Sequence, residues 1–107
     1  MRDGVDAVFA ALADPSRRFV VETLAARGTA TPTELAADLP VTRQAVAKHL
    51  AALRSAGLVE ASRAGRETRY ALTPAPLAEA VGWIEEVGAA WDGRLEALKR
   101  LVEPASG

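Results

Sequence analysis

The stretch from residue 42 to 54 carries side chains whose chemistry suits the edges of DNA bases. Arg43 can donate to O6 and N7 of guanine, and Gln44 can pair with N6 and N7 of adenine. Thr42 and Lys48 add a hydroxyl and an ammonium group, and no acidic residue lies in the stretch to repel phosphate. The stretch therefore predicts a surface that contacts double-stranded DNA.

Helical spacing places these groups on one side of a helix. Val46, Leu50 and Leu53 recur at i, i+4 and i+7 and form an apolar face, so the polar groups and Arg54 lie opposite. In most helices an exposed polar face of this kind is only a solvated surface. The elements on either side of this helix favour the DNA interpretation.

A short helix precedes this helix and a hairpin follows it. The segment TPTE at residues 31–34 is a capping box that starts a helix through residue 38. After residue 58 the pattern becomes typical of two strands joined by a turn at residues 63–66. Arg63 and Arg66 at this turn can reach phosphates or the minor groove, and Arg69 follows on the second strand.

Together these elements predict a winged helix-turn-helix, mainly α with a small β-hairpin. We expect one domain over residues 1–107, with five helices and a two-stranded wing. From the second helix Phe19, Val20 and Leu24 are expected to face inward. The parts are the N-terminal helices at 4–26, the helix-turn-helix at 31–57, the wing at 58–73 and the C-terminal helix at 76–102.

Composition limits the core and excludes several classes of protein. Of the hydrophobic residues 24 are alanine, which adds little transfer free energy, so we expect self-association to complete the core. The absence of cysteine and the single histidine argue against disulfides, thiol catalysis and His-rich metal sites. Without a nucleophile–base pair or a Gly-rich phosphate loop, no enzyme is expected. No apolar run suits a membrane span or a signal peptide, so we expect a cytoplasmic protein that does not bind membranes.

The distribution of charge is more informative than the formal total of −1. Residues 39–73 carry six basic and two acidic side chains, for a net +4. Residues 1–38 and 74–107 have net charges of −2 and −3. A positive reading region on an acidic scaffold favours DNA binding, which the total alone would have argued against.

His49 admits three interpretations. It falls beside Leu50 at the margin of the apolar face, where packing and a local hydrogen bond are favoured. A phosphate contact comes next, and on that basis His49 joins the candidate DNA contacts. Metal ligation by a lone histidine is remote.

Residues 9–18, FAALADPSRR, resemble the ALADPTRR opening of the ArsR/SmtB family of transcriptional regulators. Residues 41–59, VTRQAVAKHLAALRSAGLV, are similar to the recognition-helix signature of that family. The wing is similar too, and the resemblance covers about residues 5–102. It implies a homodimeric winged helix, usually a repressor, whose two recognition helices enter an imperfect palindrome about 34 Å apart.

The resemblance and the spacing together define two sets of candidate residues. The DNA contacts are Thr31, Thr33, Thr42, Arg43, Gln44, Lys48, His49, Arg54, Arg63 and Arg66. The family dimerises through its first and last helices, which implies an interface of Val5, Val8, Phe9, Leu12, Trp83, Ile84, Val87, Trp91, Leu95 and Leu98. Trp83 and Trp91 either pack the dimer or line a small-molecule pocket between subunits. The alternative function is a protein–protein interaction module that docks through the last helix.

The resemblance also bears on what the protein senses. Many members bind metals through a Cys-x-Cys pair that aligns here with Thr31 and Thr33, and others use His on the last helix, which has none. Without thiolates a soft-metal site is excluded. Residues 90–101 resemble a non-metal-sensing subgroup, so no metal and no cofactor are expected. The chain does not encode the operator sequence, the sign of regulation or the identity of a small-molecule effector.

Overall fold

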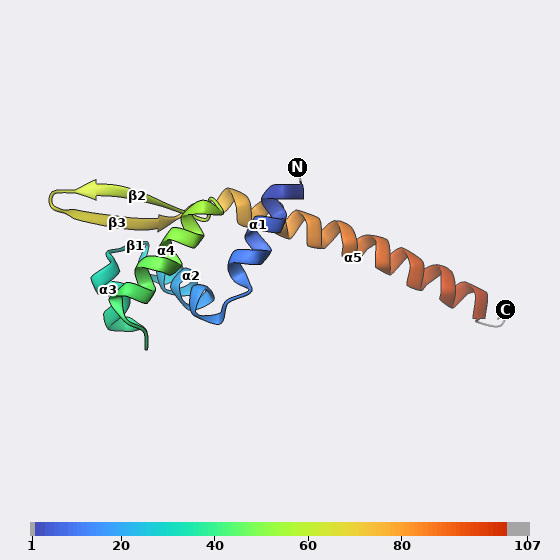
Figure 1. Cartoon of the computed structure of the whole chain (residues 1–107). Helices are drawn as coiled ribbons and strands as arrows, with labels where there is room; N and C mark the ends of the chain where they lie inside the picture. The colour runs from blue at the N-terminus through green and yellow to red at the C-terminus, as the bar shows by residue number, and fades with distance from the viewer. Residues whose placement is uncertain (1, 103–107) are drawn as a thin grey trace.

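The computed structural model describes residues 2–102, which form five helices and three strands (Figure 1). In chain order they are α1 (Arg2–Leu12), α2 (Pro15–Arg27), β1 (Thr29–Ala30), α3 (Pro32–Asp38), α4 (Arg43–Ser55), β2 (Val59–Ala64), β3 (Glu67–Leu72) and α5 (Pro74–Val102). The prediction of a mainly α winged helix-turn-helix with five helices is confirmed. Residues 1 and 103–107 of the expected domain lie outside the described residues.

Side chains hold the turn between α1 and α2. The Asp14 carboxylate caps α2 and accepts a hydrogen bond from the backbone N–H of Ser16 at 2.8 Å. Arg17 Nε donates to the carbonyl of Ala11 at 2.6 Å. This carbonyl lies in the last turn of α1, where helix carbonyls lack intrahelical partners. The ADPSRR segment at residues 13–18 therefore ends one helix and starts the next.

Threonine side chains start both helices of the helix-turn-helix. Thr31 Oγ1 accepts from the N–H of Glu34 at 3.1 Å, and Glu34 Oε1 accepts from the N–H of Thr31 at 2.9 Å. This is the predicted capping box, and it satisfies two backbone donors reciprocally. At α4, Thr42 Oγ1 accepts from the N–H of Ala45 at 3.1 Å. Local hydrogen bonds thus determine where α3 and α4 begin.

The sheet has three antiparallel strands in the order β1-β3-β2, so the wing is larger than the two-stranded hairpin we predicted. The additional strand β1 pairs Thr29 with Ala71 and Ala30 with Tyr70. Two residues carry no alternation from which a strand can be predicted, and long-range pairing alone defines β1. At the tip of the hairpin Gly65 has a φ of 66°, a conformation that glycine adopts without steric strain.

One hydrophobic core joins α1, α2, α3, α4, the strands and the start of α5. Its largest fully buried side chains are Val8, Val20, Leu24, Leu35, Val46, Leu50, Leu53 and Leu58. The prediction that Phe19 faces inward is wrong, because its side chain is 53% exposed. The buried side of α2 runs through Val20 and Leu24, and Phe19 lies outside that line beside Leu39 and Pro40.

Two residues that we expected at a dimer interface lie inside the protomer instead. Val8 is fully buried in the core, and Val5 is only 8% exposed. Both face inward because α1 packs one side against α2 and the start of α5. Phe9, on the outer side of α1, is 38% exposed and packs edge-on against Trp83 at 5.5 Å between ring centroids.

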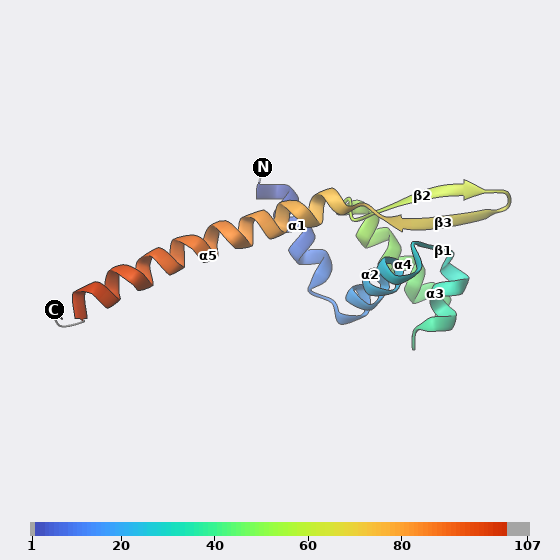
Figure 2. The ribbon, with the colours of Figure 1, turned by 180° about the vertical axis from the view of Figure 1, so that it is seen from behind.

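The molecule is strongly elongated because α5 leaves the rest of the chain. Figures 1 and 2 show α5 and the β2–β3 hairpin extending in opposite directions. The described chain measures 72 × 29 × 20 Å with a radius of gyration of 19.6 Å, against about 13 Å for a compact domain of this length. We call residues 2–83 the head and residues 84–101, whose side chains are all exposed, the arm. Within the described residues, no helix is long and apolar enough to cross a membrane.

Candidate nucleic-acid interface

The outer face of α4 presents the predicted reading residues to solvent. Val46, Leu50 and Leu53 hold the inner face in the core at 0–1% exposure. The side chains on the opposite face are all exposed, and they are Thr42, Arg43, Gln44, Ala47, Lys48, Ala51 and Arg54. The two alanines leave room for the helix backbone to approach a groove floor or a thymine methyl group. The structure thus brings together the five polar candidates on α4 that lie opposite the core.

An open groove joins this face to the wing. It has a volume of about 600 Å³ and lies between the start of α3, the first turn of α4 and strand β3. Thr31, Thr33, Arg43 and Arg66 line it, so candidates from three separate elements meet at one surface. Arg63 lies exposed at the same end of the hairpin.

The hydroxyl groups at this surface are not equivalent. Thr31 is half-buried, and its oxygen already caps α3. Thr33 is exposed and has no such bond among the described residues. Thr42 caps α4 through its oxygen but is exposed, so its O–H can still donate to a ligand. We therefore assign Thr31 a structural role and keep Thr33 and Thr42 as candidate contacts.

His49 lies on a different side of α4. At 100° per residue it points away from Arg43, Gln44 and Lys48. It is half-buried and close enough to Asp14 for its charge to lower the pKa of that carboxyl. The structure therefore does not bring His49 to the reading face, and the packing interpretation agrees better with its position.

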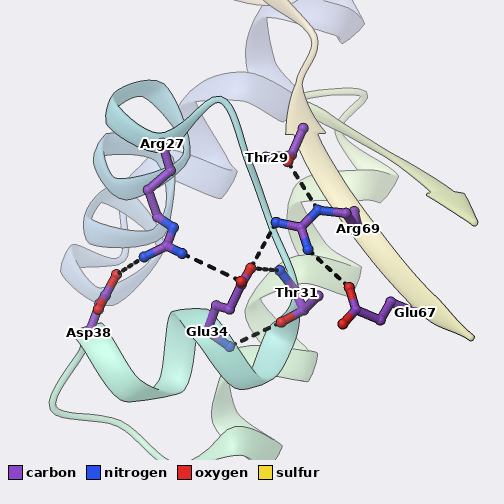
Figure 3. A network of polar contacts seen from close by, with 7 residues as sticks. All are labelled: Arg27, Thr29, Thr31, Glu34, Asp38, Glu67 and Arg69. Carbon is purple, nitrogen blue, oxygen red and sulfur yellow. Dashed lines mark hydrogen bonds and ion pairs between the residues drawn. The ribbon is translucent and has the colours of Figure 1, made fainter. Parts of the chain in front are cut away.

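Arg69, which we grouped with the basic residues of the wing, is fully engaged inside the protomer. Figure 3 shows its guanidinium at the centre of a polar network. It donates to Thr29 Oγ1 at 3.1 Å, to Glu34 Oε1 at 2.9 Å and to Glu67 Oε2 at 3.0 Å. These partners come from β1, α3 and β3, so Arg69 ties the wing to the helix-turn-helix.

A second arginine extends this network to the end of α2. Arg27 Nη1 donates to Asp38 Oδ2 at 2.7 Å, and Arg27 Nη2 lies 3.6 Å from Glu34 Oε2. The N–H of Thr31 lowers the pKa of Glu34 most, and the charges of Arg69 and Arg27 lower it further against partial desolvation. Sequence reasoning missed this cluster, although Glu34 of the capping box was the available signal.

Electrostatic pairing separates the structural cations from those that can bind a ligand. Arg27 and Arg69 are ion-paired, and Glu34 and Glu67, the acids nearest the groove, are neutralised by them. Five other cations of the head and wing are exposed and form no ion pair within the described residues, namely Arg43, Lys48, Arg54, Arg63 and Arg66. Unpaired cations on one side of a protein are the electrostatic signature of phosphate binding.

Comparison with known proteins agrees with this geometry. A helix-turn-helix domain model matches residues 12–61. The chain is 40% identical over 92 residues to the HTH-type transcriptional regulator YuzN of Bacillus subtilis, which covers 79% of this chain and 100% of the relative. A solved ArsR-like transcriptional regulator from Rhodococcus sp. RHA1 superposes with a TM-score of 0.84 and 44% identity over 94% of each chain. The chain belongs to the ArsR-like family of transcriptional regulators.

A third relative of this ArsR-like regulator is CmtR of Mycobacterium tuberculosis. It is 47% identical over 83 residues, which cover 77% of this chain and 69% of the relative. The solved structure of CmtR, described as a cadmium metal-sensor, superposes with a TM-score of 0.59 over 72% of this chain and 79% of that one. Family membership makes the exposed cationic surface a DNA-binding surface of a transcriptional regulator, and the protein is not an enzyme.

Proposed function

We propose that this ArsR-like regulator is a repressor that binds an imperfect palindrome as a homodimer, with residues 42–54 and the wing of each copy contacting one half-site. The observation that carries the proposal is the groove that joins Thr33, Arg43 and Arg66 on the unpaired cationic side of the head. A regulator of this kind acts on the chromosome, so we place it in the cytoplasm.

The geometry assigns different roles to the contacting residues. Arg43 and Gln44 lie in the first turn of α4, where recognition helices reach base edges, so they read sequence. Lys48 and Arg54 lie further along the exposed face, and Arg63 and Arg66 lie at the wing tip, where they bind phosphate or an adjacent minor groove.

The homodimer rests on the arm. From residue 84 to 101 every side chain is exposed, including five large apolar ones between 84 and 98. An isolated helix of this length is marginal in water unless its apolar face is packed. These side chains, which we propose as the interface together with Phe9, Leu12 and Trp83, are Ile84, Val87, Trp91, Leu95 and Leu98.

We also propose that this regulator does not sense soft metals, in contrast to the cadmium sensor CmtR. The chain has no cysteine, and cadmium-type metals select thiolate ligands. Within the described residues, no group of three or more His, Cys, Asp or Glu side chains is placed to hold a metal ion. Cadmium and zinc should therefore leave DNA binding unchanged in a mobility-shift titration.

The DNA-binding surface is tested by mobility shift over a salt series, with DNA from upstream of the encoding gene and with random DNA. Affinity should fall steeply with salt because phosphate contacts release counterions. Arg43→Ala should relax base preference at one position, whereas Arg63→Ala should weaken binding to all sequences alike. Arg100→Ala, an exposed arginine of the arm, is the matched control and should change neither. Salt-independent binding, or equal binding to random DNA, would overturn the proposal.

A further inference from the structure

The exposed apolar residues of α5 follow a heptad pattern with one position left open. From Val81 the stripe continues at Ile84, position 88, Trp91, Leu95 and Leu98, at alternating intervals of three and four residues. This alternation is the spacing of helices that pack along a shared seam. Of these stripe positions only 88 carries no side chain, because it is a glycine.

Nothing within the protomer explains a glycine at this position. A Cβ on Gly88 would meet no atom within 4 Å, so no close approach inside the chain requires its absence. Glycine within a helix destabilises it relative to alanine. Gly82 and Gly93 are equally open, but at 100° per residue both lie on the side of α5 opposite the stripe. Gly88 alone makes a gap in the apolar seam.

The largest side chain of the arm lies one heptad step from this gap. Trp91 is 58% exposed, and its indole has no aromatic partner within the described residues, unlike Trp83, which packs on Phe9. A gap beside a bulky, uncovered side chain is self-complementary if two copies of the helix meet in opposite directions, because a twofold axis then places each residue against the other.

We infer that Gly88 is the socket for Trp91 of a second copy, with the two α5 helices packed antiparallel. This inference rests on the homodimer proposed above. In an antiparallel pair residue numbers rise along one helix and fall along the other, so one pairing determines the rest. If Gly88 faces the partner's Trp91, then Ile84 faces the partner's Leu95 and Val81 faces the partner's Leu98. Every stripe residue from 81 to 98 is then covered.

Other registers cover the stripe less well. A shift of one heptad in one direction sets Trp91 against the partner's Leu95 and leaves Gly88 opposite the partner's Leu98. The opposite shift sets Gly88 against the partner's Ile84 and moves the last turns of the arm past the start of the partner's helix. A parallel pair places glycine against glycine and indole against indole, which combines a void with an overpacked layer.

The inferred register carries one unfavourable contact that makes it distinctive. Glu85 and Asp92 each follow a stripe residue, so they lie on the same flank of α5 and face each other across the antiparallel pair. Like charges oppose the association, and salt screens that repulsion. Dimerisation should therefore strengthen as salt rises, whereas DNA binding weakens.

Sedimentation equilibrium of the full chain tests the socket. Gly88→Leu should raise the dimer dissociation constant by about tenfold or more, because the added side chain fills the space of the partner's indole. Gly93→Leu makes the same change, with the same gain in helix propensity, on the opposite side and should leave the constant unchanged or lower. The double exchange of Gly88→Trp with Trp91→Gly should recover association that each single change weakens. Equal effects at 88 and 93, or additive effects in the double variant, would overturn the inference.

Cross-linking tests the direction of the helices, since the chain has no cysteine of its own. A short bismaleimide should join Ile84→Cys to Leu95→Cys when the two variants are mixed and should join neither to itself. A dimer in which Ile84→Cys cross-links alone would overturn the antiparallel register but leave the homodimer standing. A monomer at concentrations that saturate the operator in mobility shift would overturn the inference and the homodimer, while DNA recognition itself would stand.

Discussion

The head and the arm solve the folding problem in opposite ways. In the head, eight large side chains are buried to below 2% exposure, and caps and ion pairs hold the elements around them. In the arm, every side chain is exposed and the only ion pair within the described residues joins Lys99 to Glu96 at 4.0 Å. The head therefore contains its own stabilising contacts, whereas the stability of the arm depends on contacts that one chain does not supply.

The largest expected effect sets two equivalent leucines against each other. Leu53→Ala should lower the free energy of unfolding by about 2–5 kcal/mol, because it leaves a cavity at a site with 0% exposure. Leu98→Ala removes the same atoms from a side chain that is 56% exposed and should cost less than about 0.5 kcal/mol in dilute protein. Urea unfolding at several protein concentrations measures both. A large loss for Leu98→Ala that is independent of concentration would contradict the division into head and arm.

Within the head, two wing arginines should differ in how they affect DNA binding. Arg66→Ala removes an exposed cation at the groove and should lower the salt slope of DNA binding by about one. Arg69→Ala breaks the network that ties the wing to α3, so affinity should fall on the order of tenfold while the slope stays constant. Mobility shift over a salt series separates the two. A lower slope for Arg69→Ala would mean that Arg69 leaves its network to contact phosphate.

The two threonines at the start of α3 provide a smaller contrast. Thr31→Ala removes the helix cap and should lower the free energy of unfolding by about 1 kcal/mol. Thr33→Ala should change stability by less than about 0.5 kcal/mol and act on DNA binding alone, since Thr33 is exposed. Thermal unfolding and mobility shift of both variants check this. Equal stability losses would argue that α3 is held by packing rather than by its cap.

The smallest effect concerns pH. The N–H of Thr31 and the charges of Arg69 and Arg27 hold the pKa of Glu34 below its ordinary value of 4.5. Its stabilising contribution is therefore present above pH 4.5 and is lost as pH falls through the lowered pKa. The difference in urea midpoint between the parent chain and Glu34→Gln should shrink from pH 7 to pH 3. A difference that is constant with pH would show that the charge of Glu34 contributes nothing.

Local signals in the sequence were sufficient for most of the head. The capping box at Thr31, the cap at Thr42 and the apolar spacing of Val46, Leu50 and Leu53 predicted α3 and α4 at their observed starts. These signals work because a cap acts within three residues and a helix face repeats within four. The exposed face of α4, with Arg43 and Gln44, followed from the same periodicity.

Contacts between distant segments were not predictable in the same way. Strand β1 exists because Thr29 and Ala30 pair with β3, and Arg69 left the DNA-contact set because Thr29 and Glu34 surround it. Val8 and Phe19 exchanged their expected positions, since an apolar residue near the margin of a helix face is buried or exposed according to which neighbour packs there. No local pattern records that neighbour.

The amino-acid sequence alone was enough to establish the family, the five helices and the chemistry of the reading face, because these depend on short-range spacing and on residue types. Tertiary structure decided which cations are unpaired, that a groove joins α3, α4 and the wing, and that α5 leaves the head with its stripe uncovered. Pairing and burial depend on which residues, remote in sequence, come within a few ångströms of each other. Only the folded chain determines those distances.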